Sequence, residues 1–298
     1  MYRGRFAPSP TGPLHLGSLI AAVASYLEAK ANKGSWLVRM EDLDKAREMP
    51  DAADDILQTL EIFGFAWDEA VVYQSSRLGV YEDILQQLRS KGLVYGCACS
   101  RKEIADSISH NPQQGLDGLI YPGTCRAGLP VDKSPRAWRI RTEDAVISFV
   151  DTIQGAFTHE LNKVVGDFVL KRADGFFAYQ LAVVADDAEQ GITHVVRGAD
   201  LLDSTSRQIY LQQVLGFSTP GYTHVPAAAN ANGEKLSKQT LAPALDKNNP
   251  GKDLWRALDF LGQRPPRELQ TSPIAEVWHW AKQHWDADSI PRARFRQY

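Results

Sequence analysis

The sequence predicts an α/β protein with a doubly wound parallel sheet, an inserted α+β subdomain and a small C-terminal helical region. Over residues 1–95, short apolar strands alternate with amphipathic helices, a pattern typical of β–α–β units. Prolines and glycines crowd residues 8–18, between the first strand and the first helix, where α/β proteins bind phosphates. All three cysteines fall within residues 97–125, where the alternation of strands and helices stops. Together these features indicate a Rossmann-like core that one insertion interrupts.

The first half of the core is expected in residues 1–95. Strands are expected at residues 4–7, 36–40 and 71–73, and helices at 18–30, 51–63 and 80–90. Gly64 and Gly92 follow the second and third helices, where a left-handed cap favours glycine. The proline-rich turn therefore lies in the crossover of the first β–α–β unit.

The remaining chain divides into three parts. The insertion is expected in residues 96–178, the second half of the core in 179–245, and a helical region in 246–298. Short strands are expected in the insertion at residues 136–142, 146–152, 156–161 and 168–172. Later elements are expected as a strand at 194–200 and helices at 201–215, 254–261 and 273–285. The arginine-rich end, residues 292–296, is expected to fray in solvent, with RNA contact as the alternative.

The composition excludes some classes of protein and leaves others open. Hydrophobic residues make up 44% of the chain and charged residues 23%, with a formal net charge of −3. A nucleic-acid partner would therefore need a local basic patch, and the charge neither supports nor excludes one. No apolar run is long enough for a membrane helix and no signal peptide is evident, so a cytoplasmic protein is expected. Three cysteines, an odd number, argue against a secreted disulfide framework.

His15 is the first candidate for chemistry. It stands just before the helix predicted at residues 18–30, where backbone N–H groups and the helix dipole attract anions. An imidazole at that place can donate to a phosphate oxygen that gains charge during a reaction. Gly12 and Gly17 allow the backbone to approach a ligand closely. The alternative is that His15 only caps the helix and the turn only connects two elements.

A second stretch, residues 233–239, fits the first. A glycine is followed by Lys235 and Lys238, three residues apart, with the Ser237 hydroxyl between them. Two mobile cations suit a pyrophosphate leaving group. The two stretches together therefore indicate nucleotide chemistry more strongly than either does alone.

The two stretches resemble the signatures of the class I aminoacyl-tRNA synthetases. His15-Leu16-Gly17-Ser18 is similar to their HIGH motif and residues 235–239 to their KMSKS loop, while residues 5–12 resemble the glutamyl subgroup. The resemblance covers residues 1–245 and implies ATP-dependent activation of L-glutamate, with Mg²⁺ accompanying ATP. It gives His15 and Lys238 catalytic roles on the phosphates. The ATP-binding residues that it implies are His15, Gly17, Ser18, Lys235, Ser237 and Lys238.

Two charged residues at strand ends are candidates for the amino-acid site. Glu41 follows the strand at residues 36–40, where its carboxylate can receive an ammonium group, or can instead cap the next helix. Arg197 lies in the strand at 194–200, and its planar guanidinium offers a fork to a substrate carboxylate. The resemblance assigns both residues to glutamate. The other glutamate-binding residues that it implies are Arg5, Ala7, Ser9 and Tyr179.

The cysteines suggest a metal site. Cys97, Cys99 and Cys125 supply three thiols, one ligand short of the tetrahedral set that structural Zn²⁺ prefers. Ligand chemistry alone favours His110 as the fourth ligand, whereas the resemblance points to the phenolate of Tyr121, four residues before Cys125. Tyr121 is the preferred interpretation, with His110 or water as rivals. The other alternative is three reduced, partly buried thiols without a metal.

The acceptor of the activated glutamate is a separate question. Glutamyl-type synthetases continue into a large anticodon-binding region, whereas only 53 residues follow Leu245 here. The chain resembles the short members of the family, which implies activation without tRNA and transfer to queuosine in the anticodon stem-loop of tRNA(Asp). A truncated enzyme charging a 3′ end, an enzyme that glutamylates another hydroxyl or amine, and a non-catalytic RNA- or amino-acid-binding paralogue stay open. No membrane and no obligate protein partner are expected.

Overall fold

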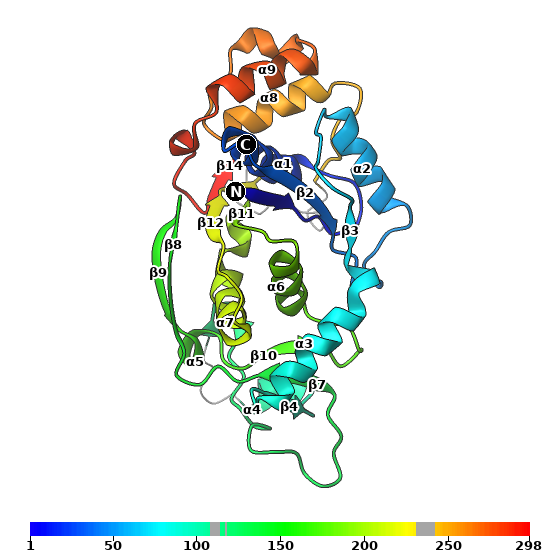
Figure 1. Ribbon diagram of the computed structural model, residues 1–298, viewed down its shortest axis with the longest axis vertical. Coiled ribbons are helices and arrows are strands. Elements are labelled where there is room, and N and C mark those ends of the chain that lie inside the picture. Colours follow the sequence, from blue (N-terminus) through cyan, green and yellow to red (C-terminus); the bar gives the residue numbers. More distant parts are fainter. Residues whose placement is uncertain (108–113, 117, 231–241) are drawn as a thin grey trace.

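The structure is a computed structural model that describes residues 1–107, 114–116, 118–230 and 242–298. The molecule is elongated (Figure 1). Helices α8 (Pro250–Phe260) and α9 (Ile274–His284) lie at one end, and a small antiparallel sheet lies at the other. The parallel core lies between them. Because the core is in the middle, it adjoins both the C-terminal helices and the insertion.

A parallel sheet forms the core, as predicted. Strands β1 (Arg3–Phe6), β2 (Ser35–Met40) and β3 (Val72–Tyr73) pair in the order β1-β2-β3. Strands β11 (His194–Gly198) and β12 (Gly221–Val225) form a second parallel pair. The Thr193 N–H donates to the Arg3 carbonyl at 3.0 Å, which joins β11 to β1. The winding direction therefore reverses between β1 and β11, and ligands of such sheets bind at the carboxyl ends near that reversal.

Helices cover the sheet. Helix α1 (Leu16–Ala31) is buried on most of its surface because it packs against β1, β11 and α8. The other core helices are α2 (Ala52–Ile62), α3 (Leu78–Ser90), α6 (Tyr179–Glu189) and α7 (Thr205–Leu215). Short 3₁₀ helices occupy Gln74–Arg77, Ala199–Ser204, Arg267–Thr271 and Ala287–Ser289. Gly64 and Gly92 have φ of 74° and 70° after their helices, which confirms the predicted caps, and Gly216 has φ of 73° after α7.

The insertion contains the small antiparallel sheet β10-β7-β4. Its described elements are β4 (Val94–Cys97), α4 (Arg101–Ser107), β5 (Gln114–Gly115), β6 (Gly118–Leu119), β7 (Ala137–Ile140), α5 (Leu161–Val164) and β10 (Phe168–Lys171). The hairpin of β8 (Val146–Asp151) and β9 (Gly155–Glu160) leaves this sheet and joins the core, where Asp151 pairs with Tyr222 of β12. The insertion is thus tied to the core by a strand, and the proposed division at residue 95 stays a prediction.

The C-terminal end differs from its prediction. Residues 292–296 were expected to fray, but β14 (Phe295–Gln297) pairs in parallel with β13 (Ala227–Ala229). Arg296 also donates to the Phe260 carbonyl at the end of α8. The prediction of a frayed terminus was wrong, because the unpaired backbone of β13 offers this segment a partner that the local sequence does not reveal. Arg292, Arg294 and Phe295 are nonetheless exposed to solvent. No helix within the described ranges is both long and apolar enough to cross a bilayer.

Candidate functional site

The turn after β1 places His15 at the start of α1, as predicted. His15 has extended backbone angles and is the N-cap of the helix, and its Nδ1 accepts from the Ser18 N–H at 3.3 Å. The imidazole therefore caps α1 while it stands at the positive end of the helix dipole. Gly12 has φ of 134°, a conformation that favours glycine. The other ring nitrogen, Nε2, lies 3.3 Å from the Ser18 hydroxyl, so the ring contacts the first turn of α1 through both nitrogens.

The turns after β1 and β2 lie side by side. The Glu41 N–H donates to the Pro8 carbonyl at 2.9 Å, so the segment with Ala7 and Ser9 borders Glu41. The carboxylate of Glu41 is 10% exposed and lies 3.5 Å from an Arg39 nitrogen, and its Oε1 has no hydrogen-bond partner within the described chain. Asp51 precedes α2, so Glu41 does not cap that helix. A buried carboxylate oxygen without a donor, at the ligand edge of the sheet, suits a ligand cation.

Arg197 lies at the carboxyl end of β11 and is 5% exposed. Its Nη1 donates to the Tyr179 hydroxyl at 3.3 Å, and its Nη2 donates to Thr205 Oγ1 at 3.0 Å. Its Nε donates to Nε2 of His224 at 2.9 Å. The structure therefore brings two of the predicted glutamate-binding residues, Arg197 and Tyr179, into direct contact. Hydrogen bonds hold the guanidinium on several sides.

Arg5 is buried, and its Nε lies 3.1 Å from the carboxylate of Asp187 in α6. The same carboxylate accepts from Arg39 at 2.8 Å. Two arginines thus share one buried acid beside Glu41, and their charges keep the pKa of Asp187 low in spite of burial, which acts to raise it. Asp187 orients Arg5 at this edge of the sheet.

Electrostatic effects connect the predicted glutamate-binding residues to one another. Burial is the largest effect on the pKa of Tyr179 and raises it, and the charges of Arg197, Glu41 and Arg5 also act on this hydroxyl. Burial likewise raises the pKa of Glu41 to about 7, although the charges of Arg39 and Arg5 oppose that shift. This cluster, Arg5, Glu41, Tyr179 and Arg197, therefore combines two cations, an acid with a pKa of about 7 and a phenol, a set of groups that can bind both ends of an amino acid.

The lysine loop, with Lys235, Ser237 and Lys238, falls outside the described residues, which resume at position 242. The residues that follow the loop contact the turn after β1. The Leu245 N–H donates to the Leu14 carbonyl at 3.0 Å, and Ala244 forms an antiparallel bridge with His15. Ala244 and Leu245, which follow the loop, are therefore anchored beside His15.

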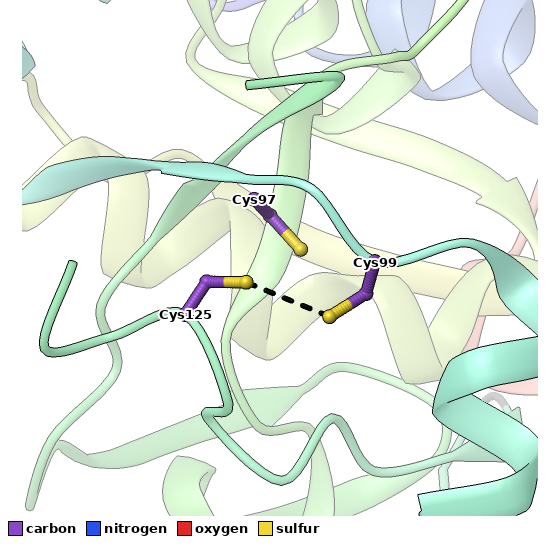
Figure 2. Close-up of side chains that lie close together, drawn as sticks. All are labelled: Cys97, Cys99 and Cys125. Carbon is purple, nitrogen blue, oxygen red and sulfur yellow. Dashed lines mark hydrogen bonds between the residues drawn. The ribbon is translucent and has the colours of Figure 1, made fainter. Parts of the chain in front are cut away.

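The three cysteine thiols converge in the insertion. Figure 2 shows the side chains of Cys97, Cys99 and Cys125 pointing toward one another, and their sulfurs lie within 4.8 Å of each other. Cys99 and Cys125 are 3.5 Å apart, near the spacing of about 3.8 Å expected between sulfurs on a tetrahedral Zn²⁺. The Tyr121 hydroxyl lies 3.4 Å from Cys97 Sγ and accepts from the Cys125 N–H at 2.9 Å.

The four side chains fit a tetrahedral metal. Tyr121 is 6% exposed and points its oxygen at the same point as the sulfurs, so it is placed to complete the set. Burial raises the pKa of Tyr121, so its phenolate form needs a nearby cation. The rival ligand His110 falls outside the described residues. The donor set, three buried or half-buried thiols and one buried phenol, suits a structural Zn²⁺, because four protein ligands leave no open position for catalysis.

Basic side chains of the insertion mostly bond protein groups. Arg139 donates to the Asp167 carbonyl at 2.8 Å, and Lys171 lies 2.8 Å from a carboxylate oxygen of Glu82. Arg172 is likewise paired with acids on both sides. Arg139, Lys171 and Arg172 therefore each have a partner within the protein.

Several residues of the site carried no sequence prediction. A buried ion network beside the predicted glutamate-binding residues consists of Arg39, Asp186 and Asp187. The contacts of Arg197 continue through His224 to Asp151. A charged residue inside the apolar run 36–40 was a signal for Arg39. His224 gave no such signal, because a single histidine in a strand is more often an ordinary core residue.

A family model described as the catalytic domain of class I tRNA synthetases (E and Q) matches residues 1–257. A protein of Dechloromonas aromatica named glutamyl-Q tRNA(Asp) synthetase is 59% identical over 98% of this chain and 96% of its own length. A protein of the same name from Neisseria meningitidis serogroup C is 55% identical, over 98% of both chains. These relatives match the chain almost from end to end.

A solved structure supports the same relationship. A glutamate tRNA ligase from Elizabethkingia meningosepticum, crystallised with its amino acid, superposes with a TM-score of 0.80 at 26% identity. The match covers 100% of this chain and 67% of the ligase. The sequence and the three-dimensional comparison thus agree on the type of catalytic fold.

Proposed function

The chain belongs to the class I tRNA synthetase family of the glutamyl and glutaminyl type, a family of ligases, and we propose that it activates L-glutamate with ATP. In this proposal glutamyl-adenylate forms without tRNA, and glutamate is then transferred to the queuosine of the tRNA(Asp) anticodon. The observation that carries the proposal is the near full-length match to relatives of that name, at identities up to 59%. The cluster of Arg197, Tyr179 and Glu41 supports the choice of glutamate, because it offers a guanidinium to a substrate carboxylate and a carboxylate to a substrate ammonium group.

Activation begins with attack by a carboxylate oxygen of glutamate on the α-phosphorus of ATP. A new P–O bond forms, the bond to the bridging oxygen breaks, and pyrophosphate leaves. Arg197 would hold the side-chain carboxylate and Glu41 the ammonium group, so that the reacting carboxylate points toward His15 at the start of α1. His15 and Lys238 would stabilise the charge that develops on the phosphates. Mg²⁺ bound with ATP would neutralise the remaining phosphate charge when present.

Transfer then makes an ester. A hydroxyl of the cyclopentene-diol of queuosine attacks the acyl carbon of the adenylate, the hydroxyl proton is lost, and AMP leaves. The ordinary alternative is transfer to the 3′ end of a tRNA, which the likeness to the glutamate tRNA ligase keeps in view. Queuosine and the 3′-terminal ribose both present a vicinal diol. The residues that bind glutamate therefore do not by themselves decide between these two acceptors.

Mapping of transferred label tests the proposal. Radiolabelled glutamate, ATP and the protein are incubated with tRNA(Asp) that contains queuosine, and nuclease digestion then locates the label. We expect label on the anticodon nucleoside and none on the same tRNA without queuosine. Label on the terminal adenosine would defeat the queuosine assignment and favour an ordinary charging enzyme. Glutamate-dependent pyrophosphate exchange without RNA separates both enzymes from a non-catalytic paralogue.

The pH dependence of glutamate binding is expected to follow Glu41. Because its pKa is about 7, Glu41 loses its charge as the pH falls through neutrality, and it then no longer attracts the ammonium group. The KM for glutamate should rise by up to roughly tenfold per pH unit below the pKa, while the KM for ATP stays nearly constant. The test is pyrophosphate exchange over a pH series, with E41Q as the comparison. A pH dependence that persists unchanged in E41Q would assign it to another group.

Glu41 should have the opposite effect on folding stability. Its folded pKa of about 7 lies above the ordinary value of 4.5, so the folded state binds the proton more tightly than the unfolded state. Stability from this group is therefore fully present below the ordinary value and declines as the pH rises toward 7. Glutamate binding weakens and folding strengthens over the same pH decrease, which distinguishes the ligand effect from acid unfolding.

The cysteine cluster is expected to hold about one Zn²⁺ per chain, because three thiolates and Tyr121 complete a tetrahedral set. Elemental analysis of protein purified without chelator measures this content. Removal of the metal should lower the melting temperature. It should not act directly on the reaction, since four protein ligands leave no position on the metal for substrate. Absence of zinc would sink the assignment, and unchanged zinc affinity in Y121F would show that the fourth ligand is another group.

A further inference from the structure

Three adjacent strands bring Asp151, His224 and Arg197 into one buried line. Asp151 ends β8, and His224 of β12 lies directly opposite Arg197 of β11 in the parallel register. Asp151 Oδ2 is 2.6 Å from His224 Nδ1, and His224 Nε2 is 2.9 Å from Arg197 Nε. The three residues are 1%, 0% and 5% exposed. Solvent therefore does not replace either hydrogen bond.

The protonation pattern of this line follows from its donors. Arg197 Nε always carries a proton, so His224 Nε2 must accept and cannot be protonated. The proton of the neutral imidazole then lies on Nδ1 and is donated to Asp151. Asp151 Oδ1 accepts from the backbone N–H groups of Ile153 and Gln154 at 3.1 and 2.9 Å, so the carboxylate is satisfied as an anion. Burial, the largest effect, lowers the pKa of His224 to about 4, which agrees with a neutral ring.

The line restricts what Arg197 can offer a ligand. A guanidinium has five N–H groups. The Nε–H is given to His224, both Nη2 hydrogens have acceptors in the Leu201 carbonyl and Thr205 Oγ1, and one Nη1 hydrogen goes to Tyr179. Among the described residues, the second Nη1 hydrogen is the one without an acceptor. The ligand-facing edge of Arg197 is therefore its Nη1 end, beside Tyr179.

We propose that Asp151 and His224 are positioning residues for substrate selection: they fix the rotation of the Arg197 guanidinium so that Nη1 meets the side-chain carboxylate of glutamate. This inference rests on the proposed role of Arg197 as the glutamate carboxylate ligand. A carboxylate is favoured over an amide at this position because the guanidinium charge pairs with an anion, whereas an amide offers only a neutral carbonyl oxygen. Asp151 belongs to the hairpin that leaves the insertion, so the proposal also makes that hairpin part of the amino-acid site.

D151N tests the proposal through the tautomer of His224. An asparagine at this position can keep the backbone bonds of Oδ1, while its NH₂ group faces His224 Nδ1 and donates to it. The ring proton must then move to Nε2, where it opposes the Arg197 N–H. We expect ¹⁵N NMR of the histidines to show His224 protonated on Nδ1 in the wild type and on Nε2 in D151N. A wild-type ring protonated on Nε2 would overturn the line of hydrogen bonds, whatever the substrate.

Kinetics test the positioning role. In D151N and H224F, the KM for glutamate in pyrophosphate exchange should rise roughly tenfold or more, with the KM for ATP nearly unchanged and the preference for glutamate over glutamine reduced. H224Q keeps an acceptor for Arg197 and should recover part of the loss. H159F is the matched control, because His159 lies in the same hairpin and bonds Ser206 instead of Arg197. It should keep wild-type constants.

The outcomes separate this inference from the proposed function. If the wild type does not bind glutamate by calorimetry, the proposed function fails, whereas the NMR result still decides the hydrogen-bonded line. If the wild type binds glutamate and both D151N and H224F retain its KM, the positioning role is overturned. If D151N does not fold, the contrast between H224F and H224Q in folded protein decides the matter, because equal constants in these two variants contradict the need for an acceptor.

Discussion

Replacing Arg197 by alanine is expected to reduce kcat/KM for glutamate in pyrophosphate exchange by roughly 10²-fold or more. The substrate carboxylate would lie beside the position of Arg197, a residue that is 5% exposed, and would lose the guanidinium that is proposed to pair with it. A buried carboxylate without its partner costs several times more than a weakened surface contact. The KM for ATP should change little, because Arg197 bonds Tyr179, His224 and Thr205 and not the turn that carries His15.

The control for R197A is R256A. Arg256 lies in α8, pairs with Asp253 and is partly exposed. Its replacement therefore removes a positive charge without changing the contacts of the proposed glutamate-binding residues. R256A should keep wild-type exchange. Equal weakening of glutamate and ATP in R197A would mean that Arg197 supports the fold or the nucleotide. Thermal unfolding of both variants shows whether the losses come from stability.

Much of the fold could be predicted from the sequence because local signals are strong in the core. The glycines at positions 64, 92 and 216 mark helix ends through their positive φ, and the apolar run at 36–40 is a buried strand. Pairing between distant segments could not be predicted in this way. The hairpin of β8 and β9 joins β12 through a contact between positions 151 and 222, which no local pattern encodes.

The same distinction applies to the site. His15, Glu41 and Arg197 stand at element ends, where an α/β sheet places ligand groups, so their positions followed from local structure. The partners that orient them did not: Asp187 and His224 come from other elements and act through buried hydrogen bonds. A pair of acids or one histidine gives the same local pattern whether it orients a ligand residue or only fills the core.

The second large effect is expected from Lys238. K238A should lower the rate of glutamate-dependent pyrophosphate exchange by roughly 10²-fold or more, the usual scale for losing a preorganised charge contact at a transition state. The reason is the leaving group: pyrophosphate gains negative charge as the P–O bond breaks, and a cation that follows it lowers the barrier. The KM values should change less than kcat, because the contact strengthens only as the bond breaks.

The anchors of the lysine loop explain why Lys238 should act at the same phosphates as His15. The loop begins after β13, and on its far side Ala244 bridges to His15 while Leu245 bonds Leu14 at 3.0 Å. The described residues just after the loop are thus held beside the start of α1, where the helix dipole favours anions, which supports a role for Lys238 at the same phosphates. K247A is the matched control, because Lys247 pairs with Asp55 just beyond the loop. Near-wild-type exchange in K238A would contradict the assignment, and an equal loss in K247A would assign the effect to loop anchoring instead of charge.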